Sequence, residues 1–471
     1  MKIRLILSLG VVLLVALGGY ADEITLDEYL MLVRTNHPFF TKEKLAVDIE
    51  KKESLSLLGA EDWILNITPS YSYVGEASAS EYGAQTRVHS VGIDANVNRS
   101  LWSTGGKLGF SFTSSYTNSD PLIGPSDRFK HGFGVSYTHP FIQNNRGTLD
   151  RLGYELSDYT IALTDVQSVE NMELFLLDAA VLFLDWVYYT EVIEIAKQRL
   201  SLAQEQLQST EKRYKSNLVD RVDVLRAEDS VRISHQTILQ LETQWKAKQA
   251  ELAVLAKTEA LFGKVPSYDL FQMVLLPQKE VVSSQLKSHS RLLQTLSILR
   301  DKLVYQRGGV VEQRRPQLDL TVTGGLYGSD EEFVESLGIY KPEATVSLMF
   351  TTNLGNRTID ARIEKLDLQV RQIEEDIMNV ETSLEASMVS ILIQIVEMEK
   401  VLSMNRAQIL SAEEKTKEEL KLYNQGRNQL TFVIQSRDNE ENAKLNYTEN
   451  AALYHGLILQ YRALLDELLP E

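Results

Sequence analysis

The sequence predicts an α+β membrane protein, in which transmembrane strands are continued by very long helices and the whole plan is built twice. Proline is absent from 141–265 and from 343–469, and each run contains only three glycines. Both runs therefore have room for helices of unusual length. Segments in which apolar and polar residues alternate stand ahead of each run, as expected of strands with one face in lipid and one in water.

The first residues have the form of an export signal. Lys2 and Arg4 precede the apolar stretch 5–17, and Gly19 and Ala21 supply small residues for a cleavage site. We therefore expect a signal peptide over 1–21. A retained membrane anchor is the less favoured alternative, because about thirteen apolar residues fall short of the roughly twenty that a spanning helix needs.

Composition excludes several classes of site. The chain has no cysteine, which rules out disulfides, thiol catalysis and thiolate metal sites. Its formal net charge of −17 argues against a nucleic-acid partner, because phosphate binding needs a basic surface. The seven histidines are scattered, and no nucleophile or metalloprotease motif occurs. We expect no cofactor, no bound metal and no enzymatic activity.

The two proline-free runs match in spacing. Arg146 and Tyr214 are 68 positions apart, and Arg357 and Tyr423 are 66 apart. Asn217 and Gly426, each three residues after the tyrosine, tolerate the left-handed conformation that ends a helix, so a chain reversal is expected at both. We therefore expect a first repeat over 22–260, with strands within 64–141 and helices over 146–213 and 219–260. A linker is expected over 261–284. The second repeat is expected over 285–471, with strands within 317–352 and helices over 356–423 and 428–468.

The long helices carry apolar seams with alternating steps of three and four residues, which are typical of coiled coils. The seams are Leu174, Leu177, Val181, Leu184 and Tyr188, continued by Ile195 and Leu202, and Leu366, Val370, Ile373, Ile377, Val380 and Leu384. A dimeric coiled-coil spacer would explain these seams equally well.

Six segments alternate with period two, as half-exposed strands do. Their apolar members include Leu65 and Ile67, Val91 and Ile93, Phe110 and Phe112, Phe133 and Val135, Leu320 and Val322, and Val346 and Leu348. A soluble half-buried sheet would also alternate, but the export signal, the helical rods and the aromatic-rich apolar face favour a membrane barrel. Since such barrels need at least eight strands, several chains must pool theirs.

In these features the chain resembles the TolC-like outer membrane efflux proteins, and the resemblance covers nearly all of the sequence after the signal. It is carried by Asn36-His37-Pro38, by 137–142, by Arg213-Tyr214 with Asn217-Leu218 and Asp223-Val224-Leu225, and by Tyr423 and Gly426 followed by Val433-Ile434. The order and duplication of these pieces are more specific than any one of them.

The resemblance implies a homotrimer in the outer membrane, with a shared transmembrane β-barrel continued by a periplasmic α-helical barrel. It also implies docking of a periplasmic adaptor protein of an inner-membrane pump at the two chain reversals. Matched by position, the docking tips are Arg213, Tyr214, Asn217, Leu218 and Val219, and Tyr423, Gly426 and Arg427. A plain helix hairpin at each reversal is the alternative.

Two features depart from the family pattern. The positions matching its acidic constriction are Phe432 and Gln435, whereas Asp220 and Asp223 stand in the first copy, so the pore constriction is either acidic or apolar. A solvated charge at the end of a helix is the alternative for Asp220 and Asp223. The first copy also has four candidate strands where the family has two. The extra pair, which turns at 103–106, either widens the barrel or forms a hairpin beside it.

We therefore predict an outer-membrane exit duct of a tripartite efflux or type I secretion system. The alternative is a periplasm-spanning coiled coil or a trimeric surface protein without transport, and a soluble enzyme is the third choice. Substrate and partner pump are not predicted, since a duct takes what its pump delivers.

Overall fold

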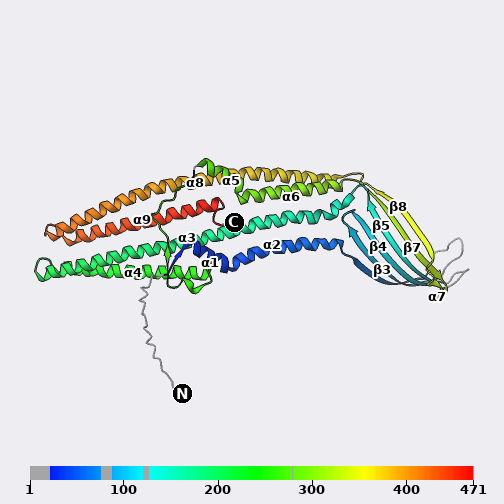
Figure 1. Cartoon of the computed structure of the whole chain (residues 1–471), viewed down its shortest axis with the longest axis horizontal. Coiled ribbons are helices and arrows are strands. Elements are labelled where there is room, and N and C mark those ends of the chain that lie inside the picture. Colours follow the sequence, from blue (N-terminus) through cyan, green and yellow to red (C-terminus); the bar gives the residue numbers. More distant parts are fainter. Residues whose placement is uncertain (1–21, 76–86, 120–126, 278, 470–471) are drawn as a thin grey trace, which may run out of the picture. The chain divides into compact units, whose positions relative to one another are not determined.

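The computed structural model describes residues 22–75, 87–119, 127–277 and 279–469 (Figure 1). The expected signal peptide, 1–21, lies outside them. The chain divides into two compact units, and each takes segments from both expected repeats. We call them the sheet unit, Lys42–Glu170 and Lys287–Leu384, and the tip unit, Met1–Thr41, Asn171–Leu286 and Glu385–Glu471.

The sheet unit is built on one six-stranded antiparallel sheet in the order β2-β3-β4-β5-β7-β8 (Figure 1). Its strands are β2 (Ile64–Val74), β3 (Val88–Leu101), β4 (Gly106–Ser119), β5 (Asp127–Pro140), β7 (Gln317–Asp330) and β8 (Lys341–Thr351). All six strands predicted from the alternation are confirmed. The extra pair, β3 and β4, lies inside the sheet between β2 and β5, so it is not a separate hairpin.

The register of the strands gives the sheet one apolar and one polar face. Residues paired across neighbouring strands point to the same side, so a row of partners can be followed from edge to edge. One such row on the apolar face is Ile67, Ala95, Phe112, Phe133, Leu326 and Pro342. The neighbouring row on the polar face is Asn66, Asn96, Ser111, Gly134, Gly325 and Glu343.

The apolar face is exposed to solvent in the single chain. Ile67 on β2 is 57% exposed, Phe133 on β5 is 56% exposed and Leu348 on β8 is 62% exposed. In a water-soluble sheet with a polar opposite face, the apolar side chains would be covered by other elements. These three side chains are not covered, so the apolar face is open on β2, β5 and β8.

Four helical segments complete the sheet unit. They are α2 (Pro38–Leu57) from residue 42 onward, α6 (Arg291–Gln313), and the first parts of α3 (Thr148–Lys215) and α8 (Arg357–Asn424). Side-chain bonds join neighbouring helices in pairs. The pairs are Ser157 with Ser54 at 2.7 Å, Lys302 with Thr160 at 2.8 Å, and Arg314 with Asp360 at 3.1 Å.

The tip unit contains the remaining parts of α3 and α8 and the helices α1 (Leu26–Asn36), α4 (Arg221–Leu255) and α9 (Leu430–Leu464), with most of α5 (Lys279–His289). A short parallel pair, β1 (Asp22–Thr25) with β6 (Lys264–Ser267), brings the start of the described chain against the expected linker. Tyr29, Phe183, Trp186 and Tyr454 are fully buried and form much of its core.

The predicted helix ends differ from the observed ones by a few residues. The first long helix begins at Thr148 rather than 146, because Asn144 and Arg146 adopt positive φ angles of 60° and 58°. The helix expected to reach 260 ends at Leu255, just ahead of Lys257, which has φ 47°. Both long helices contain 68 residues, and both α4 and α9 contain 35.

Within the described residues, none of the helices combines the length and the apolar character that crossing a membrane requires.

Candidate functional site

The two chain reversals of the tip unit are built in the same way. Asn217 and Gly426 have φ angles of 54° and 71°, which confirms the predicted left-handed residue at both positions. The amide of the next residue then bonds back across the turn: Leu218 N–H donates to the Arg213 carbonyl, and Arg427 N–H to the Leu422 carbonyl, each at 2.9 Å. This is the bond pattern of a glycine-type helix C-cap, and asparagine is the side chain that replaces glycine there at low cost.

The tips of the two hairpins pack on each other through a small apolar cluster. Tyr423 at the end of α8 is only 2% exposed and lies with Ala227 of α4 and Leu430 and Val433 of α9, all of them buried. Because these residues come from both hairpins, the cluster fixes α3–α4 against α8–α9 at the reversals.

A polar contact beside this cluster joins Arg213 to Tyr423. The guanidinium lies over the tyrosine ring, with its carbon 4.2 Å from the ring centroid, and Nη1 donates to the Tyr423 carbonyl at 2.9 Å. These two predicted docking residues therefore serve the packing between the hairpins. In particular, the buried Tyr423 ring is not available to an external partner in this arrangement.

The other predicted docking residues lie at the surface. Leu218 is 67% exposed and Tyr214 is 40% exposed, and Asn217, Gly426 and Arg427 are exposed as well. Val219 is half-buried. An exposed leucine and tyrosine at a helix reversal form a small apolar surface of the kind that protein contacts use.

The four constriction candidates follow the reversals. Asp220 is the N-cap of α4, with an extended backbone and no capping bond from its side chain, and it is exposed. Asp223 is half-buried and pairs with Arg226 at 3.3 Å. Phe432 is 48% exposed and Gln435 is exposed. Arg226 partly neutralises the Asp223 carboxylate, so the electric field of this carboxylate is weaker than that of an unpaired acid.

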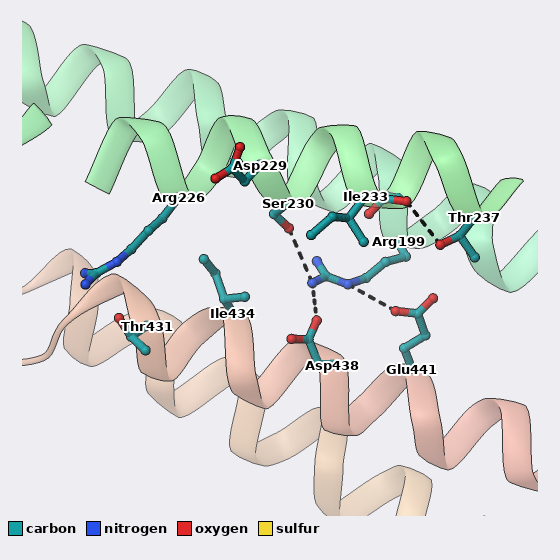
Figure 2. Close-up of a pocket in the computed structure, with 11 residues that line it drawn as sticks. Arg199, Arg226, Asp229, Ser230, Ile233, Thr237, Thr431, Ile434, Asp438 and Glu441 are labelled. Atoms are coloured by element: carbon teal, nitrogen blue, oxygen red, sulfur yellow. Dashed lines mark hydrogen bonds and ion pairs between the residues drawn. The ribbon is translucent and has the colours of Figure 1, made fainter. Parts of the chain in front are cut away.

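Sequence reasoning missed a buried charged site farther from the reversals. Arg199 of α3 has only 8% of its side chain exposed and reaches α9, where it pairs with Asp438 and, at 3.3 Å, with Glu441 (Figure 2). Its Nη2 also lies 3.5 Å from the Ser230 hydroxyl of α4. Arg199 thus joins three helices from both hairpins.

The surroundings of Arg199 form a cavity of about 390 Å³ between α4 and α9. A second arginine, Arg437, is also buried and donates to the Leu202 carbonyl at 2.6 Å. Burial lowers the pKa of Arg437, and the positive charge of Arg199 lowers it further. Burial also raises the pKa of Glu441, an effect that Arg199 opposes. Arg199, Arg437 and Glu441 line a second, much smaller space between α3 and α9.

The signal for this site was present in the sequence. Arg199 lies four residues after Ile195 and three before Leu202, so it occupies a position of the apolar seam of α3. A charged side chain at a seam position is costly unless it is paired, and such residues fix how helices align.

No protein-family model matches the chain, and no curated protein sequence does. Among solved structures, it is similar to the outer membrane protein VceC from Vibrio cholerae, with 11% identity and a TM-score of 0.65 over 94% of this chain and 96% of that one.

Two further structures give the same result. CusC has 11% identity and a TM-score of 0.68, over 96% of this chain and 95% of that one. The outer membrane channel CmeC from Campylobacter jejuni has 12% identity and a TM-score of 0.64, over 94% of this chain and 85% of that one. At the level of the fold, the resemblance seen in the sequence is confirmed: the chain has the architecture of the outer membrane efflux channels.

Proposed function

We propose that the chain is one subunit of an outer-membrane exit duct that passively conducts substrates from a periplasmic pump and adaptor to the exterior. The observation that carries the proposal is the two-faced sheet, with its exposed apolar side chains on one face and polar side chains on the other. A continuous apolar face of this size is disfavoured in water and stable in contact with lipid. The opposite face would then line a water-filled passage.

The edges of the sheet support assembly of a homotrimer. The outermost strands, β2 and β8, each contain eleven residues, and every one is exposed. Open edges are not tolerated in a bilayer, because unpaired amide and carbonyl groups are costly there. Three copies of a six-stranded sheet would supply eighteen strands, and barrels of about that size enclose an aqueous channel. In this proposal β3 and β4 widen the barrel.

The tip unit supplies the contact with the rest of the transport system. We assign adaptor docking to the exposed residues of the two reversals, which are Tyr214, Asn217, Leu218, Gly426 and Arg427. We assign the half-buried Val219, which follows Leu218 in the chain, to the same surface. Arg213 and Tyr423 act indirectly, since they hold the two reversals together. In this proposal the duct belongs to a tripartite efflux system or to a type I secretion system. The chain itself carries no catalytic role.

Single-channel recording in planar bilayers tests the proposal. Purified trimer is expected to insert and give stepwise, long-lived conductance, with electrophoretic mobility that changes on heating, as for other barrels. The heat-denatured protein is the control. If protein with native helix content and trimeric mobility stays electrically silent, a structural coiled coil without transport becomes the better explanation.

A further inference from the structure

The short helix α7 (Phe333–Ser336), which follows β7, packs on the apolar face of the sheet. The Phe333 ring meets the rings of Phe129 and His131 edge-on, at centroid distances of 5.5 Å and 5.2 Å. Phe129 and His131 belong to β5 and point to the same side as Phe133, and they lie near the end of the apolar face, where β7 stops at Asp330. His131 is left only 4% exposed.

A glycine of β7 makes room for this contact. A Cβ atom at Gly328, which pairs with His131 on the same face, would lie 2.1 Å from the Ser336 carbonyl oxygen and 3.0 Å from that of Gly338. Ser336 itself is fully buried. At Gly324, two steps back on the same face, a Cβ atom would meet nothing within 4 Å. The close approach of α7 is therefore local to Gly328.

The outward side of the segment is mostly apolar although it is exposed, and the exposed Glu335 is the one charged residue within 333–340. Phe333 is 51% exposed, Val334 76%, Leu337 49% and Tyr340 73%. Acidic and basic residues stand on both sides of this group, namely Asp330, Glu331, Glu332 and Lys341. A short apolar cluster that contains aromatic residues and is bounded by charges is typical of segments at a membrane interface.

We propose that residues 333–340 are a lipid anchor that inserts shallowly into the outer leaflet around the rim of the barrel. The inference rests on the proposed function, because the apolar face on which α7 packs is there the lipid-facing surface. The segment extends that surface outward without a break, and its position is fixed by Gly328. Acyl chains just below the headgroups are the occupant that fits both the apolar side chains and the flanking charges.

The test uses single cysteines, since the sequence contains none. Val334→Cys is labelled with an environment-sensitive dye in trimers reconstituted into phosphatidylcholine vesicles. Aqueous iodide and lipids with a nitroxide near the headgroup or near the chain end serve as quenchers. We expect the headgroup-proximal nitroxide to quench the label strongly and iodide to quench it weakly. Leu348→Cys, from the apolar face of β8, and Thr345→Cys, from the polar face, serve as references for lipid and water.

A second variant tests whether the packing of α7 positions the anchor. Gly328→Ala in the Val334→Cys background is expected to displace α7 and shift the label from lipid quenching to iodide quenching. Gly324→Ala is the matched control and should leave the label unchanged.

The possible outcomes distinguish failure of the lipid-anchor proposal from failure of the proposed duct function. A Val334 label quenched by iodide alone, with a Leu348 label quenched by lipid, overturns the anchor and leaves the proposed function standing. Protection of the Val334 label from all three quenchers also overturns it, because a protein then covers the segment. A Leu348 label that no lipid nitroxide reaches contradicts the proposed function itself.

Discussion

At the scale of single residues, the same chain position has different chemistry in the two hairpins. Asp223 and Phe432 both lie six residues after the left-handed residue of their reversal, yet one is a half-buried acid paired with Arg226 and the other a half-exposed aromatic ring. The sequence predicted both as constriction residues. It did not predict the Arg226 pair, because an ion pair depends on the rotamers of two long side chains.

We predict that Asp223→Ala raises the single-channel conductance and weakens the preference for cations. The shorter alanine side chain would widen the passage, which raises the conductance. The three carboxylates, one per subunit, would no longer stand around the passage and attract cations despite their arginine partners, which weakens the preference for cations. Ion selectivity is measured as the reversal potential in a salt gradient.

Asp229→Ala is the control for this experiment, because Asp229 is an exposed aspartate of the same helix that already pairs with Arg232. It should alter neither conductance nor selectivity. If Asp223→Ala leaves selectivity unchanged while Phe432→Ala raises conductance, the constriction is apolar and the acidic interpretation is wrong.

At the scale of elements, the helices and strands were predictable because each depends on a local pattern. Alternation of period two identified all six strands, and Asn217 and Gly426 located the two reversals. The helix α7 was not predicted, since four residues are too few for a periodic signal and its position depends on Gly328, which contacts it only in the folded chain. The burial of Arg199 was missed for a similar reason, because its partners lie on α9, more than two hundred residues away.

We predict that Arg199→Met loosens α9 from α3 and lowers the stability of the tip unit. Removing the guanidinium leaves Asp438 and Glu441 without their cation and close to each other, and the loss of a charged hydrogen bond of this kind costs about 2 kcal/mol. The pair with Asp438 contributes less than the pair with Glu441, because the Asp438 side chain is half exposed. Thermal unfolding followed by helical circular dichroism measures the effect.

Arg232→Met is the matched control. Arg232 has 71% of its side chain exposed and pairs only with Glu228 and Asp229 of its own helix among the described residues. Surface pairs of this kind contribute roughly 0.5 kcal/mol or less to stability. The thermal unfolding midpoint of Arg232→Met should therefore stay near that of the unchanged protein. Equal midpoints for Arg199→Met and Arg232→Met would show that Arg199 does not hold the hairpins together.

At the scale of the whole molecule, the single chain leaves two open edges that match each other. The six strands alternate in direction, so β2 and β8, the first and last, run antiparallel to one another. A β8 edge can therefore meet the β2 edge of another copy and continue the antiparallel ladder without a change of pattern. Contacts of this head-to-tail kind form a closed ring when the rotation from one copy to the next adds up to a full turn.

The strand count was predictable from alternation, but the single continuous sheet was not. The sheet depends on the pairing of β5 with β7, which are separated in the sequence by several helices.

We predict that cysteines placed on these two edges form disulfides between copies. Ser70→Cys on β2 is combined in turn with cysteine at Glu343, Thr345 or Ser347 on β8, all on the polar face that water and oxidant reach. Neighbouring strands lie roughly 4.8 Å apart, within the reach of a disulfide, and partners at two-residue steps sample alternative registers of the joint. After mild oxidation, one combination should give a ladder of one, two and three linked chains on a non-reducing gel.

Ser115→Cys on β4, an inner strand with both neighbours in its own chain, should give no ladder with the same partners. Failure of all three combinations, or a ladder that continues beyond three chains, would contradict a closed trimer.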